Sequence, residues 1–142
     1  MFRILKWNSD GIYRSGTTHE PLEFYLNALT ISNHTELLLG YFSSSAISLL
    51  SLGFAKFLYN NGTIRIVINN ILSEQDKVTI HKGINDEVNN VSLDISNIHE
   101  IKSKLDEYGK HFFECLAWLI AQNKIQFQII KPKDKQGISH YK

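Results

Sequence analysis

The chain has 142 residues, of which 43% are hydrophobic and 20% are charged, as in an ordinary globular protein. This length suits one domain with a hydrophobic core and is too short for two. The formal net charge of +1 gives no bulk electrostatic reason to expect a nucleic-acid or membrane partner. A single cysteine, Cys115, excludes an internal disulfide and favours a reducing, cytoplasmic location. The longest apolar run, residues 46–58, is interrupted by Lys56, so we expect no membrane association.

The first third of the chain predicts a short hairpin and then a helix. Residues 2–7 and 12–16 flank Asn8-Ser9-Asp10-Gly11, a sequence typical of a tight turn, which predicts a β-hairpin. A helix is expected after Thr18, with Pro21 in its first turn. Its apolar face consists of Leu22, Tyr25, Leu26 and Leu29.

The next segment predicts a strand–helix–strand unit. Residues 36–42 form an apolar run without alternation, which is typical of a parallel strand covered on both faces. One of the serines 43–45 is expected to cap a helix that ends near Asn60. That helix is apolar almost all round, so we expect it to be central, with residues 63–69 forming a parallel neighbouring strand.

The second half predicts two helices and two strands. Ser73 is expected to cap a short helix that stops at Gly83, and a loop follows over residues 85–94. Asn97 and Glu100 form the capping box of the longest helix, in which Gly109 marks a bend or a close contact. The apolar stripe of this helix is Ile98, Ile101, Leu105, Tyr108, Phe112, Leu116, Leu119 and Ile120. Residues 125–131 predict a strand and residues 138–142 begin another.

The order of these elements predicts the fold class. Strands that alternate with helices indicate an α/β fold, a layered sandwich with a mixed, largely parallel sheet flanked by helices. We expect residues 1–142 to form a single domain.

The sequence offers few residues in patterns that carry chemistry. Its six histidines form no zinc-type pattern with cysteine or with each other, and its glycines form no phosphate-binding loop. We therefore expect neither a metal nor a cofactor. The serines of "GYFSSSA" are explained by helix capping. Five lysines between residues 124 and 142, against the single acid Asp134, indicate either a solvated loop or a landing surface for phosphate.

His140 and Lys142 are the strongest candidate site residues. They stand two residues apart in a strand pattern, so their side chains are expected on one face. A neutral imidazole is a competent nucleophile toward phosphorus, and a lysine beside it can hold a non-bridging oxygen. On spacing alone, the same pair also fits a basic strand on the surface.

The wider context of this pair resembles a known family. The segment "ELLLGYFSSSAISLLSLGFAKFLYNNGTIRIVINN", followed by a long helix, a strand and "GISHYK", resembles the first half of a phospholipase D-superfamily domain. The resemblance is greatest to the versions at the amino terminus of bacterial DEAD/DEAH-type helicases and restriction-associated nucleases. The family motif is His-x-Lys-x-x-x-x-Asp, and the sequence ends before the Asp. The resemblance therefore implies an amino-terminal portion of a longer protein, inactive by itself.

The resemblance also implies roles for individual residues. His140 matches either the nucleophile that forms a phosphohistidine or the partner that protonates the leaving oxygen, and Lys142 matches the phosphate-binding lysine. Because ligands gather at the carboxyl ends of parallel strands, we expect both near Ser43 and Ser44, whose helix start offers N–H groups to a phosphate.

The expected function is a metal-independent phosphodiesterase, a hydrolase of the nuclease type that acts on nucleic acid, with DNA as the expected substrate. The second histidine that such a site needs is expected from a second copy of the motif in the parent chain or from a homodimer partner. The alternative is a non-catalytic α/β module for nucleic-acid or protein docking.

Overall fold

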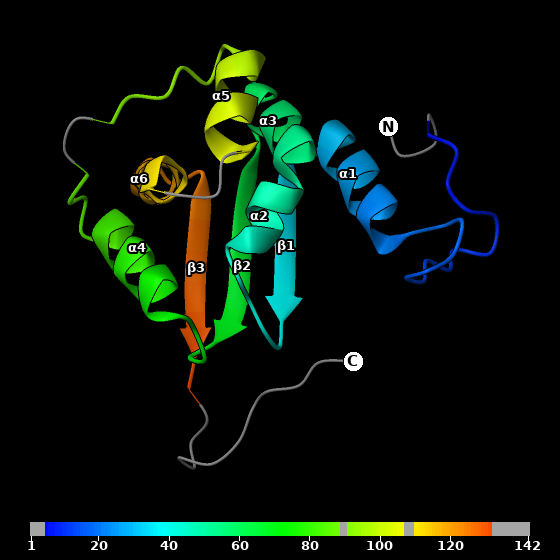
Figure 1. Cartoon of the computed structure of the whole chain (residues 1–142), viewed down its shortest axis with the longest axis horizontal. Helices are drawn as coiled ribbons and strands as arrows, with labels where there is room; N and C mark the ends of the chain where they lie inside the picture. Colours follow the sequence, from blue (N-terminus) through cyan, green and yellow to red (C-terminus); the bar gives the residue numbers. More distant parts are fainter. Residues whose placement is uncertain (1–4, 89–90, 107–109, 132–142) are drawn as a thin grey trace.

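The structure, a computed structural model, describes residues 5–88, 91–106 and 110–131. Figure 1 shows a small sheet with helices packed against it. The elements in chain order are α1 (Pro21–Ile31), β1 (His34–Leu39), α2 (Ser45–Leu49), α3 (Ser51–Tyr59), β2 (Thr63–Asn69), α4 (Glu74–Ile84), α5 (Ile98–Asp106), α6 (Lys110–Ala121) and β3 (Ile125–Ile130). The three described strands are parallel and lie in the order β1-β2-β3, so the chain is an α/β protein.

The strand register determines which side chains share a face of the sheet. β1 pairs with β2 from His34–Thr63 onward, and β2 pairs with β3 from Ile64–Ile125 onward. Side chains alternate along each strand, so Ile64 and its register partners lie on one face and Arg65 and its partners on the other. The predicted parallel pairing of the two central strands is confirmed. The first of them begins at His34 and ends at Leu39, earlier at both ends than the predicted residues 36–42.

The hydrophobic core lies between the helices and one face of the sheet. That face presents Ile64, Ile66 and Ile68 of β2, all almost fully buried. Against it pack the largest buried side chains of the helical layer, which are Phe57, Leu58, Ile101, Leu105, Phe112, Leu116 and Leu119. The expected burial of the crossover is confirmed at Phe57, and Leu50 is partly buried against the core.

Two predictions about burial are wrong. β1 is not covered on both faces: its residues alternate in exposure, and Leu38 on the outer face is 49% exposed. The crossover helix is not buried all round, because Leu49 and Leu52 lie mostly in solvent. Both differences have the same cause, since the described helices cover only one face of the sheet and leave an outer side of the helical layer in water (Figure 1).

The two long predicted helices differ in detail from the structure. The crossover is divided into α2 and α3 at Leu50, whose ψ of 14° departs from helical geometry. The longest predicted helix is represented by α5 and α6. Gly109, the expected position of a bend, lies outside the described residues.

The expected hairpin near the amino terminus is confirmed only at its turn. Gly11 N donates to Asn8 O at 3.0 Å, but residues 5–20 contain no strand. Instead, the ring centroid of Trp7 lies 5.5 Å from the ring centroid of Phe24 in α1, and the ring centroid of Tyr13 lies 5.2 Å from that of Phe24. An isolated two-stranded hairpin is marginally stable, whereas aromatic contacts with α1 bury apolar surface.

The remaining predictions concern α1, α4, β3 and the carboxyl-terminal strand. α1 begins at Pro21, and Ser73 caps α4 by accepting from Asp76 N. β3 lies within the predicted residues 125–131. The strand predicted at residues 138–142 lies outside the described residues. Within the described part of the chain, no helix is long and apolar enough to cross a membrane.

Candidate phosphate-binding edge of the sheet

The carboxyl ends of the three strands meet at one edge of the sheet, marked by the arrowheads in Figure 1. Gly40 follows β1, Asn69 ends β2, and Lys131 follows β3. In open α/β sheets, ligands bind at the carboxyl ends of parallel strands. This edge is therefore the place at which a site built by this fold is expected.

Asn69 links the ends of β1 and β2. Its Nδ2 donates to Gly40 O at 2.6 Å, and the side chain is almost fully buried. A buried amide that bonds to a backbone carbonyl fixes that carbonyl in place, because breaking the bond leaves a polar group without a partner. The hydrogen bond from Asn69 thus holds the first residue of the loop after β1 in position.

The serine turn, residues 43–45, follows this loop. Ser43 O accepts from Ala46 N at 3.0 Å and Ser44 O accepts from Ile47 N at 2.9 Å, so the backbone of the turn opens α2. The hydroxyls of Ser43 and Ser45 lie 2.7 Å apart. Ser44 occupies the N-cap position, but its side chain makes no capping bond. The prediction that a serine here precedes the helix is confirmed, and side-chain capping by Ser44 is not observed.

Phe42 anchors the serine turn to the third strand. Its side chain is 5% exposed, and its ring lies 5.0 Å from that of Phe127 in β3 in an edge-on arrangement. Such aromatic pairs contribute about 0.5–1.5 kcal/mol beyond the area that they bury. The loop between β1 and α2 is therefore held at two points, by the hydrogen bond from Asn69 to Gly40 and by the packing of Phe42.

A second polar group lies at the start of α4, which follows β2 along the chain. Ser73 Oγ donates to Asp76 Oδ2 at 2.9 Å and accepts from Asp76 N at 3.0 Å. Asp76 is 2% exposed, and its Oδ1 has no hydrogen-bond partner among the described residues. A carboxylate in the first turn of a helix is stabilised by the helix dipole, which offsets part of the cost of its burial.

The candidate residues named from the sequence are placed only in part. Ser43 is half-buried and Ser44 is fully buried, so the hydroxyl of Ser43 is the more accessible of the two. His140 and Lys142 lie outside the described residues, and their expected proximity to Ser44 stays a prediction. Lys131, the last described residue, is exposed directly after β3.

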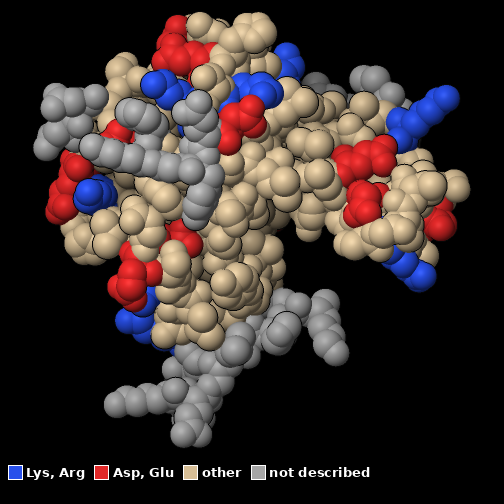
Figure 2. Space-filling model, viewed as in Figure 1, with Lys and Arg blue, Asp and Glu red and all other residues tan. Residues whose placement is uncertain are grey.

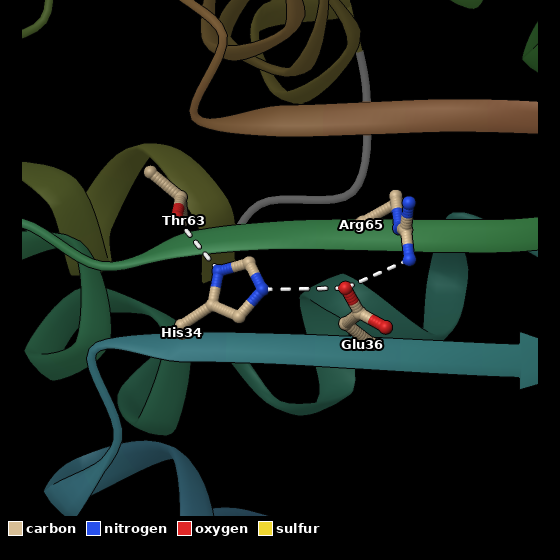
Figure 3. A network of polar contacts seen from close by, with 4 residues as sticks. All are labelled: His34, Glu36, Thr63 and Arg65. Atoms are coloured by element: carbon tan, nitrogen blue, oxygen red, sulfur yellow. Dashed lines mark hydrogen bonds and ion pairs between the residues drawn. The ribbon is translucent and has the colours of Figure 1, made fainter.

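A polar network that the sequence analysis missed lies on the uncovered face of the sheet (Figure 3). Arg65 Nη2 lies 2.8 Å from Glu36 Oε1, and His34 Nε2 approaches the same oxygen at 3.4 Å. His34 Nδ1 lies 3.1 Å from Thr63 Oγ1 across the strand pair. The alternation of polar residues in His34-x-Glu36 and Thr63-x-Arg65 is the signal that indicates a solvated sheet face.

This network shifts the titration of Glu36 without adding much stability. The hydrogen bond from Arg65, followed by that from His34, holds the pKa of Glu36 below its usual value of 4.5. All three side chains remain about half exposed, and solvent-exposed ion pairs contribute little to the free energy of unfolding. The network therefore sets the charge pattern of this face.

Charge on the opposite side of the molecule is mixed in sign. Figure 2 shows acidic and basic side chains interspersed over the described surface, with uncharged surface between them. No continuous basic track crosses the described part of this view. Within the described residues, no three His, Cys, Asp or Glu side chains gather in a group that could hold a metal ion.

No protein-family model, no curated protein and no solved structure matches the chain.

Proposed function

We propose that the chain is an amino-terminal phospholipase D-like phosphodiesterase domain that acts on nucleic acid, with DNA as the substrate, within a longer helicase or restriction-type protein. The observation that supports this most directly is the parallel β1–β2 unit, which brings the serine turn to the carboxyl edge of the sheet. β3 ends at the same edge, and His140 follows Ile130 by ten residues. Ten residues span up to about 33 Å, so His140 can reach the serine turn.

The proposed chemistry consists of two displacements at phosphorus. In the first, a ring nitrogen of one histidine forms a bond to phosphorus, and the bond from phosphorus to the leaving oxygen breaks. A second imidazole, on the opposite side, protonates that oxygen. Water then attacks phosphorus, the phosphorus–nitrogen bond breaks, and the second imidazole takes the proton from water. His140 has one of these two histidine roles.

The phosphate oxygens need positive charge and hydrogen-bond donors during both steps. Lys142 supplies the charge, and the serine turn supplies the hydroxyl of Ser43 and the backbone at Ser44. Because Ser44 is fully buried, its contribution is through its main chain, whereas Ser43 contributes its side chain. The second histidine comes from a second copy of the motif in the parent chain or from a second subunit related by a two-fold axis.

Cleavage assays in the presence of EDTA test this proposal. The full-length protein is expected to cut DNA in EDTA, because the histidine nucleophile needs no metal to activate it. His140→Ala is expected to abolish cutting, because one of the two histidines of the reaction is lost. The 142-residue chain alone is expected to show no cutting above background. Cutting that requires Mg²⁺, or that survives His140→Ala, contradicts the proposal.

A non-catalytic docking module is the second candidate function. The uncovered face of the sheet, with Glu36, Leu38 and Arg65 exposed, supports it, since parallel sheets are usually covered on both faces. This candidate is favoured if the full-length protein cuts nothing and if His140→Ala leaves its affinity for DNA or for a partner protein unchanged.

A further inference from the structure

β1 lies at one side of the sheet that the described strands form. β1 pairs with β2 on one side, and among the described residues no strand pairs with it on the other. Thr63 N donates to Asn33 O at 3.1 Å, which fixes the phase of the parallel ladder. In a parallel ladder, the backbone N–H and C=O groups of every second residue bond to the same neighbouring strand, so those of Thr35 and Leu37 bond to β2. The N–H and C=O groups of His34, Glu36 and Leu38 consequently point away from the sheet.

An apolar groove lies directly beside this edge. The β1 groove is a cavity of about 260 Å³ between α1, β1 and the start of α3. Its lining includes Phe24 and Tyr25 of α1, Thr35 and Leu37 of β1, and Leu50 and Phe54 beneath them. Figure 2 shows the surface hollowed between the projecting α1 region and the body of the molecule. The groove opens on the helix side of the sheet, where Thr35 and Leu37 point.

The free edge of β1 and the β1 groove together fit an added β-strand. A strand placed beside β1 would satisfy the three outward-pointing peptide groups, and its alternate side chains would enter the groove. An apolar cavity of about 150 Å³ holds one benzene ring, so the β1 groove has room for about two small apolar side chains. Both features are thereby explained by the same occupant.

The opposite side of the added strand would lie next to Glu36. Glu36 Oε1 contacts Arg65 and His34, whereas Oε2 makes no hydrogen bond among the described residues. A carboxylate oxygen at a strand edge favours a cation on the neighbouring strand. The side chain between the two apolar ones is thus expected to be basic.

We propose that β1 is a docking edge for an extended segment of a partner protein in which apolar residues alternate with a basic one. The apolar side chains fill the β1 groove, and the basic one pairs with Glu36 on the uncovered face. This inference goes beyond the phosphodiesterase proposal and does not depend on His140 or Lys142.

A synthetic peptide tests the docking edge. The probe is a capped seven-residue peptide with valine at every odd position, threonine at the second and sixth positions, and lysine at the fourth. It is expected to bind the 142-residue chain and to slow hydrogen exchange at the amides of His34, Glu36 and Leu38. A peptide of the same composition with its valines consecutive is the control and is expected to bind about tenfold more weakly.

Backbone methylation of the peptide identifies the hydrogen bonds. In a parallel arrangement the valine N–H groups face β1, whereas in an antiparallel one those of threonine and lysine face it. N-methylation of one set, and not of the other, is therefore expected to weaken binding. Equal affinity of both methylated peptides and the parent peptide overturns the proposal, as does unchanged exchange at the three amides.

A matched pair of protein variants completes the test. Leu38→Pro removes an outward-pointing N–H without removing a bond to β2, and proline is tolerated at such edge positions. It is expected to weaken peptide binding about tenfold relative to Leu38→Ala. Should Leu38→Pro fail to fold, the methylated peptides decide. Dimerisation of the wild-type chain that Leu38→Pro abolishes would assign the edge to a second copy and overturn the partner proposal.

Discussion

Asn69 Nδ2 donates to Gly40 O at 2.6 Å and so joins the carboxyl ends of β1 and β2. The Asn69 side chain is almost fully buried, and the bond connects residues that are distant in the sequence. It sets the starting point of the loop that carries Ser43. The geometry of the candidate phosphate-binding edge therefore depends on a side chain that has no expected contact with substrate.

The first prediction concerns this bond. Asn69→Ala leaves the Gly40 carbonyl without its amide partner and is expected to lower the free energy of unfolding by about 1–3 kcal/mol. Urea denaturation followed by circular dichroism measures the change. Asn70→Ala, at the exposed neighbouring position, is the control and is expected to stay within about 0.5 kcal/mol of the wild type. Equal stability of the two variants would show that the bond contributes nothing.

The second prediction compares two buried helical glycines. A Cβ at Gly83 would lie 2.6 Å from Ile120 Cβ and 2.7 Å from Ala117 O, too close for the packing of α4 on α6. Gly83→Ala is therefore expected to lower the free energy of unfolding by about 1–3 kcal/mol. At Gly53 the nearest atoms are Leu26 Cδ2 at 3.2 Å and Leu26 Cα and Leu29 Cβ at 3.3 Å, so α1 needs to shift by only a few tenths of an ångström.

Gly53→Ala is the matched control for this comparison. Alanine gains up to about 1 kcal/mol over glycine in a helix, which offsets the tighter contact with Leu26. Gly53→Ala is thus expected to change stability by less than about 1 kcal/mol in either direction. Thermal unfolding that ranks Gly83→Ala as the more stable variant would contradict the packing of α4 on α6.

The third prediction concerns the pKa of Glu36. Arg65 holds this pKa below 4.5, so the ionised form is favoured in the folded state. The contribution to stability is present above the pKa of the unfolded chain and is lost as pH falls through the lower pKa of the folded state. Titration of the Glu36 side chain by NMR is expected to give a midpoint below 4.5.

Removal of the guanidinium provides the comparison. Arg65→Gln is expected to raise the pKa of Glu36 toward its usual value, because the first cause of the shift is lost. Lys77→Gln, which removes a cation from the separate pair with Glu74, is expected to leave it unchanged. A Glu36 midpoint that does not move in Arg65→Gln would show that the ion pair does not form in solution.

The sequence predicted the elements of the fold better than their surroundings. The apolar pattern of residues 63–69 and the Ser73 cap depend on neighbours a few residues away, and both are confirmed. The exposure of Leu38 and Leu49 depends on which side of the sheet the helices pack, a long-range property that an apolar run does not encode. An unbroken apolar segment therefore predicts burial on both faces, which is wrong for β1.

The candidate site shows the same limit. The serines that follow an apolar strand pattern predict a turn before the next helix, and the position of the serine turn between β1 and α2 is confirmed. The roles of Asn69 and Asp76 could not be predicted, because a single polar residue at an element boundary is usually solvated. Both side chains are almost fully buried, and such burial depends on how elements distant in the sequence pack together.

The central claim is that His140 takes part in phosphodiester cleavage, and a search for the covalent intermediate tests it most directly. The full-length protein is mixed with a DNA oligonucleotide in EDTA and quenched in base, since phosphohistidine is labile in acid. Mass spectrometry of its peptides then locates the attached nucleotide.

If His140 is the nucleophile, the adduct lies on His140 and is absent from His140→Ala. If it is the proton donor, the adduct lies on the second histidine, and His140→Ala is expected to form little of it, because the leaving oxygen is then not protonated. DNA cleavage that proceeds without any histidine adduct, or at an undiminished rate in His140→Ala, would contradict the account.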